Sequence, residues 1–354
     1  MWSPSSGKRT SFQQTNLVSD VALVAEKTDA NFVNCWGIVA VAAGAPPPKS
    51  CHKQEPAPFW VANNGTSTLV WSTHPEAPVT VDPEGPTGLV VNDTLLFQVR
   101  QNPLSPGLPS ELITVTETGA ILGFNATVDP ANAIVTVAPT GAKVFKGAAL
   151  LASLLYVANF HDGVVEVYNG SWALVNTFTD AALLATGYAP FNVAAIRGQL
   201  YVSFARQDGD AHDDVPGVGS GYVDVFSGEG ELERRLINRG ALNSPWAMLE
   251  LPSPACGGGG GGKRVLAVGN FGDGRLNAFD LCDGTFLGPV ADCLGNPVSI
   301  DGLWGVADAA AAVHQRHGRG GSRELFFAAG INNENDGLVG KLAACVPPST
   351  SPLS

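Results

Sequence analysis

The chain has 354 residues, and 20 Lys+Arg against 32 Asp+Glu give it a formal net charge of −12. A negative charge of this size disfavours nucleic acid or an anionic membrane surface as the main partner. With 45% hydrophobic residues, 42 Gly and 25 Pro, the composition favours a turn-rich β protein, because Gly and Pro interrupt helices. No apolar run reaches the roughly 20 residues that cross a bilayer, so we expect no membrane span.

A short strand and then a sixfold repeat follow along the chain. The segment TNLVSDV at 15–21 has the alternation of a strand. Each repeat holds a short apolar strand, a second strand, a Gly-containing turn and a third strand. The second strands align on Ala62, Val115, Ala158, Ser203, Gly269 and Ala328, in steps of 53, 43, 45, 66 and 59 residues. Such spacing predicts an all-β, six-bladed β-propeller of four-stranded blades that carry insertions.

The sixth repeat lacks a fourth strand, which each of the first five supplies after its third. The chain instead ends near Cys345 in a Pro/Ser-rich tail. We therefore expect 15–21 to pair with the sixth blade and close the ring, with Val18 facing inward, because closure removes exposed strand edges. Residues 15–345 are predicted to form one propeller domain, and 1–14 and 346–354 to be disordered.

Low-complexity insertions distinguish the two faces of the predicted propeller. All of them fall between first and second strands, on the face that we call lower: 42–58, 100–110, 256–263 and 309–322. Tolerance of featureless insertions marks a surface under little constraint. We therefore expect a functional site on the upper face, which the starts of the inner strands share with the hairpins between second and third strands.

The upper face collects most candidate residues, among them Asn64 and Glu117 in two hairpins. Its longest hairpin loop, 205–222, holds a histidine followed by two aspartates, and adjacent carboxylates repel unless they are solvated, hydrogen-bonded or bound to a cation. The candidate ligand-binding residues are Trp36, His161, Asp208, His212, Asp213, Asp214 and Trp304. Because tryptophans recur from repeat to repeat, packing between blades is an alternative role for Trp36 and Trp304.

Oxygen-bearing side chains at strand ends point to a possible metal site in the channel. The candidate ligands are Asn63, Asn159, Asn270 and Asp301. They suit Ca²⁺ or Mg²⁺ better than zinc, which prefers Cys and His. Ca²⁺ is thus the one cofactor that the sequence suggests, and His212 would be the general base of any reaction. Neither a nucleophile elbow nor a phosphate or dinucleotide loop occurs in a supporting context.

The six cysteines are scattered and form no CxxC pair. Cys282 and Cys293 flank one predicted hairpin, and a disulfide could join them if their Cα atoms lie within about 7 Å. Two free thiols are the alternative, and the sequence does not decide between them.

Several motifs resemble an uncharacterised, mainly bacterial propeller family whose members often carry a secretion signal and a PEP-CTERM sorting tail. The resemblance rests on motifs such as WGI (36–38), FWVANNGTSTL (59–69), RQDGDAHDDVPGVGSGYVDVF (206–226) and IDGLWGV (300–306). The Pro-x-Gly-apolar segments more loosely resemble NHL-repeat propellers. The resemblance implies an exported, six-bladed propeller without an established activity. This chain shows neither a secretory signal nor the sorting tail, so its compartment is left open.

Two classes of function fit these observations. The first is a monomeric binding module whose upper face engages a protein, a carbohydrate or a small molecule. The second is a Ca²⁺-dependent hydrolase of the lactonase or esterase kind, with the metal in the central channel. Binding ranks first because the sequence holds no complete catalytic constellation.

Overall fold

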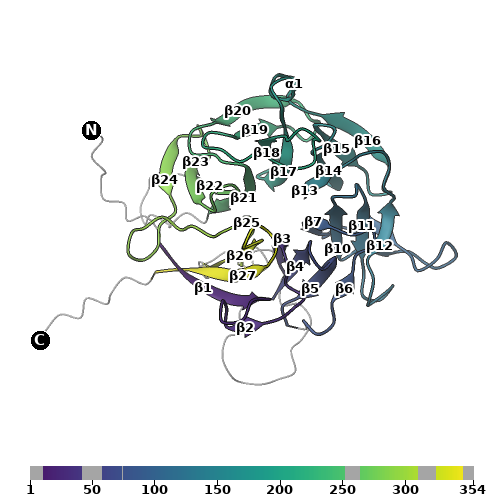
Figure 1. Ribbon diagram of the computed structural model, residues 1–354. Helices are drawn as coiled ribbons and strands as arrows, with labels where there is room; N and C mark the ends of the chain where they lie inside the picture. Colours follow the sequence, from purple (N-terminus) through teal and green to yellow (C-terminus); the bar gives the residue numbers. More distant parts are fainter. Residues whose placement is uncertain (1–10, 42–57, 74, 252–263, 310–323, 346–354) are drawn as a thin grey trace, which may run out of the picture.

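A computed structural model of the protein describes residues 11–41, 58–73, 75–251, 264–309 and 324–345. Its strands form six small antiparallel sheets around a central axis, which confirms the predicted six-bladed β-propeller (Figure 1). The helix of the described chain, α1 (Ala181–Leu184), is a single turn before the fourth blade. No helix in this part of the chain is long and apolar enough to cross a membrane.

The first three blades run from inside to outside in chain order. Blade 1 contains β3 (Cys35–Ala40), β4 (Phe59–Asn63), β5 (Thr68–Trp71) and β6 (Val79–Thr80). Blade 2 contains β7 (Pro86–Val91), β10 (Leu112–Thr116), β11 (Ile121–Phe124) and β12 (Ile134–Val137). Blade 3 contains β13 (Phe145–Leu151), β14 (Leu154–Asn159), β15 (Val164–Tyr168) and β16 (Leu174–Phe178).

The last three blades follow the same order, except that the sixth takes its outer strands from the N-terminal part of the chain. Blade 4 contains β17 (Tyr188–Ile196), β18 (Gln199–Arg206), β19 (Tyr222–Phe226) and β20 (Leu232–Asn238). Blade 5 contains β21 (Pro245–Leu251), β22 (Val265–Asn270), β23 (Leu276–Asp280) and β24 (Phe286–Pro289). Blade 6 contains β25 (Leu303–Asp308), β26 (Glu324–Ala329), β27 (Leu338–Ala344), β1 (Phe12–Ser19) and the short β2 (Lys27–Thr28).

The ring closes as predicted, through antiparallel pairing of β1 with β27, where Val18 lies opposite Val339 and is buried. The strand begins at Phe12, three residues before the predicted start at Thr15 and inside the segment 1–14 that was expected to be disordered. The physical reason is burial, because the Phe12 side chain packs into the hydrophobic cluster between blades 5 and 6. Its N–H also donates to the Ala291 carbonyl at 2.9 Å.

A β-bulge recurs in the inner strand of every blade. In β13, for example, Phe145 lies opposite Asn159 and Gly147 opposite Ala158, so Lys146 is an extra residue. The equivalent residues are Trp36, Thr87, Lys146, Phe191, Trp246 and Trp304, which we call the bulge ring. Bulges re-aim side chains, and all six side chains of the ring are buried, none more than 5% exposed.

Glycine follows the bulge residue in four of the six inner strands, at Gly37, Gly88, Gly147 and Gly305. A Cβ at Gly37 would lie 2.5 Å from the Thr87 oxygen of the next blade, and one at Gly88 would lie 2.8 Å from the Ala148 nitrogen. The missing side chains therefore let neighbouring inner strands approach closely around the axis.

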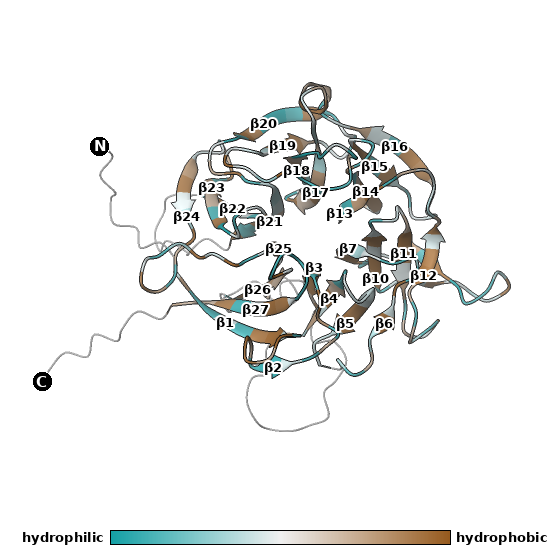
Figure 2. Ribbon diagram, viewed as in Figure 1, coloured by the Kyte–Doolittle hydropathy of each residue, from teal (hydrophilic) through white to brown (hydrophobic). Residues whose placement is uncertain are grey.

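The hydrophobic core lies between adjacent blades rather than in one central mass. Hydrophobic segments, brown in Figure 2, are accordingly spread over strands around the ring. In one cluster Ile113 and Val115 of blade 2 pack with Leu155 and Val157 of blade 3. Each sheet thus buries both faces against its neighbours, which accounts for the near-continuous apolar runs of the second strands.

A disulfide joins Cys293 to Cys345, with their Cα atoms 5.8 Å apart, and Cys282 is a free, exposed thiol. The suggested Cys282–Cys293 bridge is therefore wrong. Cys345 is held beside the loop that follows β24 because its N–H bonds to the Ser11 carbonyl at the start of β1. The pairing depends on ring closure, which brings these distant segments together.

Of the four predicted insertions, 100–110 is the one that lies wholly within the described residues. It lies in the connection between β7 and β10, as expected, and contains β9 (Leu108–Pro109), which pairs with β8 (Gln98–Val99) just before the insertion. The segments 42–58, 256–263 and 309–322 fall outside the described residues except at Pro58 and Ala309, and the tail 346–354 falls outside entirely.

Replacing Val18 with Asp tests the closing strand. We expect the V18D change to lower the free energy of unfolding by about 3 kcal/mol or more, because it leaves an unpaired carboxylate in the core. The control is Gln14→Asp on the same strand, where the side chain is exposed. Urea denaturation of both variants measures the difference, and equal losses would contradict the assignment of β1 as a buried closing strand.

Candidate functional site

The bulge ring closes the upper end of the channel with stacked aromatic rings. Trp36 stacks on Trp304 with ring centroids 3.5 Å apart, and Trp304 stacks on Phe271 at 3.9 Å. Trp246 meets Trp36 and Trp304 edge-on. Trp36 and Trp304, two of the predicted ligand-binding residues, are thus 2% and 1% exposed, and their faces are covered by other rings. This arrangement favours the packing alternative for both residues.

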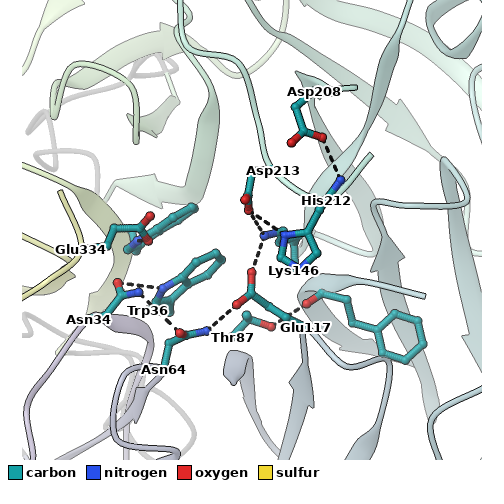
Figure 3. Close-up of polar contacts among 12 residues, drawn as sticks. Asn34, Trp36, Asn64, Thr87, Glu117, Lys146, Asp208, His212, Asp213 and Glu334 are labelled. Atoms are coloured by element: carbon teal, nitrogen blue, oxygen red, sulfur yellow. Dashed lines mark hydrogen bonds and ion pairs between the residues drawn. The ribbon is translucent and has the colours of Figure 1, made fainter. Parts of the chain in front are cut away.

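Lys146 is the charged member of the bulge ring. Its Nζ atom lies 2.5 Å from Glu117 Oε1 and 3.1 Å from Asp213 Oδ1, and 5.0 Å from the centroid of the Trp36 ring (Figure 3). Glu117 lies in the turn between β10 and β11, and Asp213 lies in the long loop between β18 and β19. Blades 2, 3 and 4 therefore converge on one ammonium group.

The two carboxylates keep this buried lysine charged. Burial of Lys146 acts to lower its pKa, but the charges of Glu117 and Asp213 outweigh it, so the pKa is raised above its ordinary value. Burial likewise acts to raise the pKa of Asp213, but Lys146 and then His212 outweigh it, so that pKa is lowered. Both groups are therefore ionised at neutral pH.

A chain of amide groups from blade 1 orients Glu117. Asn64 Nδ2 donates to Glu117 Oε2 at 2.9 Å, and Asn34 Nδ2 donates to Asn64 Oδ1 at 3.5 Å. Asn34 Oδ1 in turn accepts a hydrogen bond from Trp36 Nε1 at 2.9 Å. The hydrogen bonds drawn in Figure 3 thus link the Glu117 carboxylate to Trp36. Trp36 belongs to a group of contacting rings that we call the plug, formed by Trp36, Trp246, Phe271 and Trp304.

Blade 6 contributes Glu334 from the turn between β26 and β27. Asn332, Asn333 and Glu334 have φ angles of 56, 55 and 63°, a left-handed run that is uncommon for residues other than glycine. Glu334 Oε1 accepts a hydrogen bond from Trp304 Nε1 at 3.2 Å. Burial raises the pKa of Glu334, the Asn34 hydrogen bond opposes this, and the Glu117 charge adds to the increase. The negative charges of Glu117 and Glu334 therefore repel each other.

We call Glu117, Lys146, His212, Asp213 and Glu334 the axial site. His212 Nδ1 lies 3.1 Å from Asp213 Oδ1, and the backbone N–H of His212 donates to Asp208 Oδ1 at 2.9 Å. The structure thus brings together three predicted candidates, Asp208, His212 and Asp213. Asp213 holds Nδ1 of the imidazole and leaves Nε2 for a ligand or for proton transfer.

Asp214, the fourth candidate of this loop, is turned into the protein. Burial raises the pKa of Asp214 to about 6, although the Ser244 hydroxyl and Lys146 act in the opposite direction. Ser244 precedes β21 and is fully buried. Asp214 Oδ2 is buried and makes no hydrogen bond within the described residues, and the ion pairs of Lys146 are made with Glu117 and Asp213 instead.

His161 lies in the neighbouring hairpin between β14 and β15 and pairs with Asp162 at 3.0 Å. Gln207 Nε2 donates to the His161 carbonyl at 3.3 Å, so this hairpin contacts the start of the 207–221 loop. His161 is part of the upper face but makes none of the axial-site contacts described above.

The predicted metal ligands come from four different blades. Asn63, Asn159 and Asn270 are fully buried at the ends of β4, β14 and β22, in blades 1, 3 and 5. Each amide bonds close to its own blade, for example Asn159 Nδ2 to Glu166 Oε1 at 2.8 Å and Asn270 Nδ2 to Asp273 Oδ1 at 3.1 Å. Asp301 is exposed and accepts from the Asn332 N–H.

A different set of groups has metal-like spacing. One ligand atom each of Glu117, His212 and Asp213 lies within 4.8 Å of the others. Lys146 Nζ, however, already contacts Glu117 Oε1 and Asp213 Oδ1, so an ammonium occupies the electrostatic position that a cation would take. These residues therefore do not fit a divalent ion while Lys146 is protonated.

Sequence reasoning missed Lys146, although a signal was available. Aligned on the repeats, Lys146-Gly147 occupies the place of Trp36-Gly37 and Trp304-Gly305. Four of the other five bulge positions hold an aromatic residue, so a lysine at this position departs from the packing pattern of the repeats. A departure of this kind indicates a functional position.

Fold and site together define a six-bladed β-propeller with a plugged channel and a charged centre on its upper face. The chain is 32% identical over 352 residues to "Uncharacterized protein R648" of Acanthamoeba polyphaga mimivirus, which covers 94% of this chain and 80% of that protein. It is 30% identical over 345 residues to "Uncharacterized protein L690" of the same virus, covering 92% and 84%. The protein belongs to the family of these two proteins, which are viral and not bacterial.

No family model matches the chain. Among solved structures, a catalytically inactive virginiamycin B lyase from Staphylococcus aureus with quinupristin aligns over 95% of this chain and 100% of that chain, with a TM-score of 0.49 and 11% identity. A likeness this distant carries no conclusion about ligand or reaction.

The raised pKa of Asp214 gives a pH prediction. Because the folded-state pKa of about 6 exceeds the ordinary aspartate value of 3.8, the stability gained from protonated Asp214 is complete below about pH 4 and lost as the pH rises through 6. Relative to Asp214→Asn, the wild type should lose about 1–3 kcal/mol of unfolding free energy between pH 4 and pH 7. Urea midpoints of both proteins measure this, and a difference independent of pH would contradict it.

Proposed function

We propose that the protein is a binding module that recognises a polar ligand at the axial site. The observation that carries the proposal is the convergence of carboxylates from blades 2 and 4 on the buried Lys146 of blade 3. Burying a charge costs free energy, and four of the other bulge positions close the channel with an aromatic residue instead. Packing alone therefore does not account for Lys146.

The site presents charged groups to solvent in fixed positions. The side chains of Asp213 and His212 are 65% and 47% exposed, and Glu117 is 20% exposed, while Lys146 lies behind them. Ion pairs and the amide chain from Asn34 and Asn64 hold these groups before any ligand arrives. Such preorganisation reduces the entropy cost of binding and suits the hydroxyl and amide groups of a carbohydrate, a small molecule or a protein surface.

An extracellular setting is part of the proposal. The resemblance of its motifs to those of propellers that often carry a secretion signal supports it. The Cys293–Cys345 disulfide supports it as well, because disulfides persist mainly in oxidising compartments. The binding module would act as a monomer, since its ring is closed within one chain.

A Ca²⁺-dependent hydrolase is the second candidate, favoured by the spacing of Glu117, His212 and Asp213 and by the His212–Asp213 pair. An ion held there would polarise a substrate carbonyl, but His212 would then be a ligand and not the base. The charge of Lys146 opposes the ion. A melting temperature that falls in EDTA and recovers in Ca²⁺ would raise this candidate above the first.

Glycan and peptide arrays, followed by affinity measurement on each hit, test the binding role. We expect Asp213→Asn to weaken a specific hit at least tenfold, because the change removes an exposed charge and loosens both Lys146 and His212. The matched control is Asp129→Asn, in the connection between β11 and β12, which should leave affinity unchanged. Hits that bind both variants as tightly as the wild type would overturn the assignment to the axial site.

A further inference from the structure

Four Asn-x-Ser/Thr sequons, the acceptor motif of N-linked glycosylation, occur in the chain. They begin at Asn64, Asn92, Asn125 and Asn169, and all four lie within the described residues. A glycan is bulky and is joined to the side-chain amide nitrogen, so an acceptor in the folded protein must present that nitrogen to solvent. The surroundings of the four amide groups therefore distinguish among the sequons.

Three of the four amide nitrogens are committed to hydrogen bonds. Asn92 and Asn125 are 9% and 8% exposed, and their Nδ2 atoms donate to backbone carbonyls at 2.9 and 2.7 Å. Asn64 Nδ2 donates to the Glu117 carboxylate of the axial site. A glycan at Asn92 or Asn125 would disrupt these buried bonds, and a glycan at Asn64 would stand over the axial site.

Asn169 lies in the turn between β15 and β16, and its amide nitrogen is uncommitted. Its Oδ1 accepts hydrogen bonds from the N–H groups of Ser171 and Ala173 at 3.0 and 3.1 Å, so the turn fixes the carboxamide. The Nδ2 atom makes no hydrogen bond to the described residues, and the side chain is partly exposed. This turn joins a third strand to a fourth on the lower face, so a glycan here would leave the axial site open.

Exposed apolar side chains lie beside this turn. The Phe97 N–H donates to the Gly170 carbonyl at 2.9 Å, and the Phe97 ring lies 5.0 Å from the Trp172 ring, so the segment before β8 packs against the turn. The exposed residues of these two segments, which we call the lower patch, are Leu95, Leu96, Leu174 and Val175, at 82, 43, 48 and 53% exposure. Exposed apolar residues that gather in one place mark a contact surface.

We propose that Asn169 carries an N-linked glycan that covers the lower patch. In the transfer, Asn169 Nδ2 forms a bond to the anomeric carbon of an oligosaccharide carried on a lipid pyrophosphate. The bond from that carbon to the pyrophosphate oxygen breaks, Nδ2 loses one proton to a base of the transferase, and the lipid pyrophosphate leaves. The C–H groups of the first sugars would then contact the leucine side chains. The proposal rests on the extracellular setting proposed above and not on the axial site.

Secretion of the full chain from a eukaryotic expression host, behind an added signal peptide, tests the acceptor site. We expect an enzyme that releases N-glycans to lower the mass of the secreted protein, and peptide mass spectrometry to place one glycan at Asn169. Ser171→Ala removes an exposed hydroxyl, breaks the sequon and keeps the Asn169 side chain in its turn, so it should abolish the glycan. Thr127→Ala breaks the Asn125 sequon at a similarly exposed position and is the matched control, which should keep the glycan.

The dye ANS, which binds exposed apolar surface, tests the covering role. Secreted Ser171→Ala should bind more ANS than the secreted wild type and Thr127→Ala, and equal binding would overturn that role. Secreted wild type without a glycan at Asn169, or with its glycan at another sequon instead, would overturn the acceptor site while leaving the extracellular setting standing. Array binding by unglycosylated protein made in bacteria tests the axial site separately, so failure of one proposal does not imply failure of the other.

Discussion

The β-bulge near the start of each inner strand is the constraint on which the rest of the structure depends. Two inner-strand residues lie opposite one residue of the second strand, so one side chain per blade turns toward the axis. The glycines beside four of these residues let the inner strands approach closely. Six blades that share this irregularity close the ring and fill the upper end of its channel.

The plug divides the axis into two chemically different compartments. Above it, carboxylates and an imidazole from hairpin loops surround the ammonium of Lys146. Below it, the inner strands of all six blades surround a cavity whose lining includes valine and alanine residues. Trp36 contacts Lys146 and also stacks on Trp304. The position of the charged groups above the plug therefore depends on how the aromatic rings of the plug pack.

The architecture could be predicted from sequence because it repeats. The six residues used to align the repeats, such as Ala158 and Gly269, are those that lie opposite the bulges. Ring closure followed from a strand missing in the sixth repeat and a spare strand at residues 15–21. Each of these inferences needs only local pattern and counting.

The site was harder to predict because its groups come from places that do not repeat. Equivalent residues such as Asn63, Asn159 and Asn270 share a depth in their blades, but the ring keeps them in separate blades. Glu117 and Asp213 meet because of the lengths and turns of two different loops, which the repeat does not encode. Similarly, Cys293 and Cys345 are neighbours only after the ring has closed.

A double-mutant cycle between Lys146 and Glu117 tests most directly whether the bulge ring supports a charged centre. The measurements are unfolding free energies of the wild type, Lys146→Met, Glu117→Gln and the double variant at neutral pH. The account predicts that Lys146→Met alone destabilises strongly, that Glu117→Gln costs much less once Lys146 is gone, and that the coupling energy is about 1–3 kcal/mol. Additive losses would contradict it, because they would mean that Lys146 is buried without a functional link to the carboxylates above it.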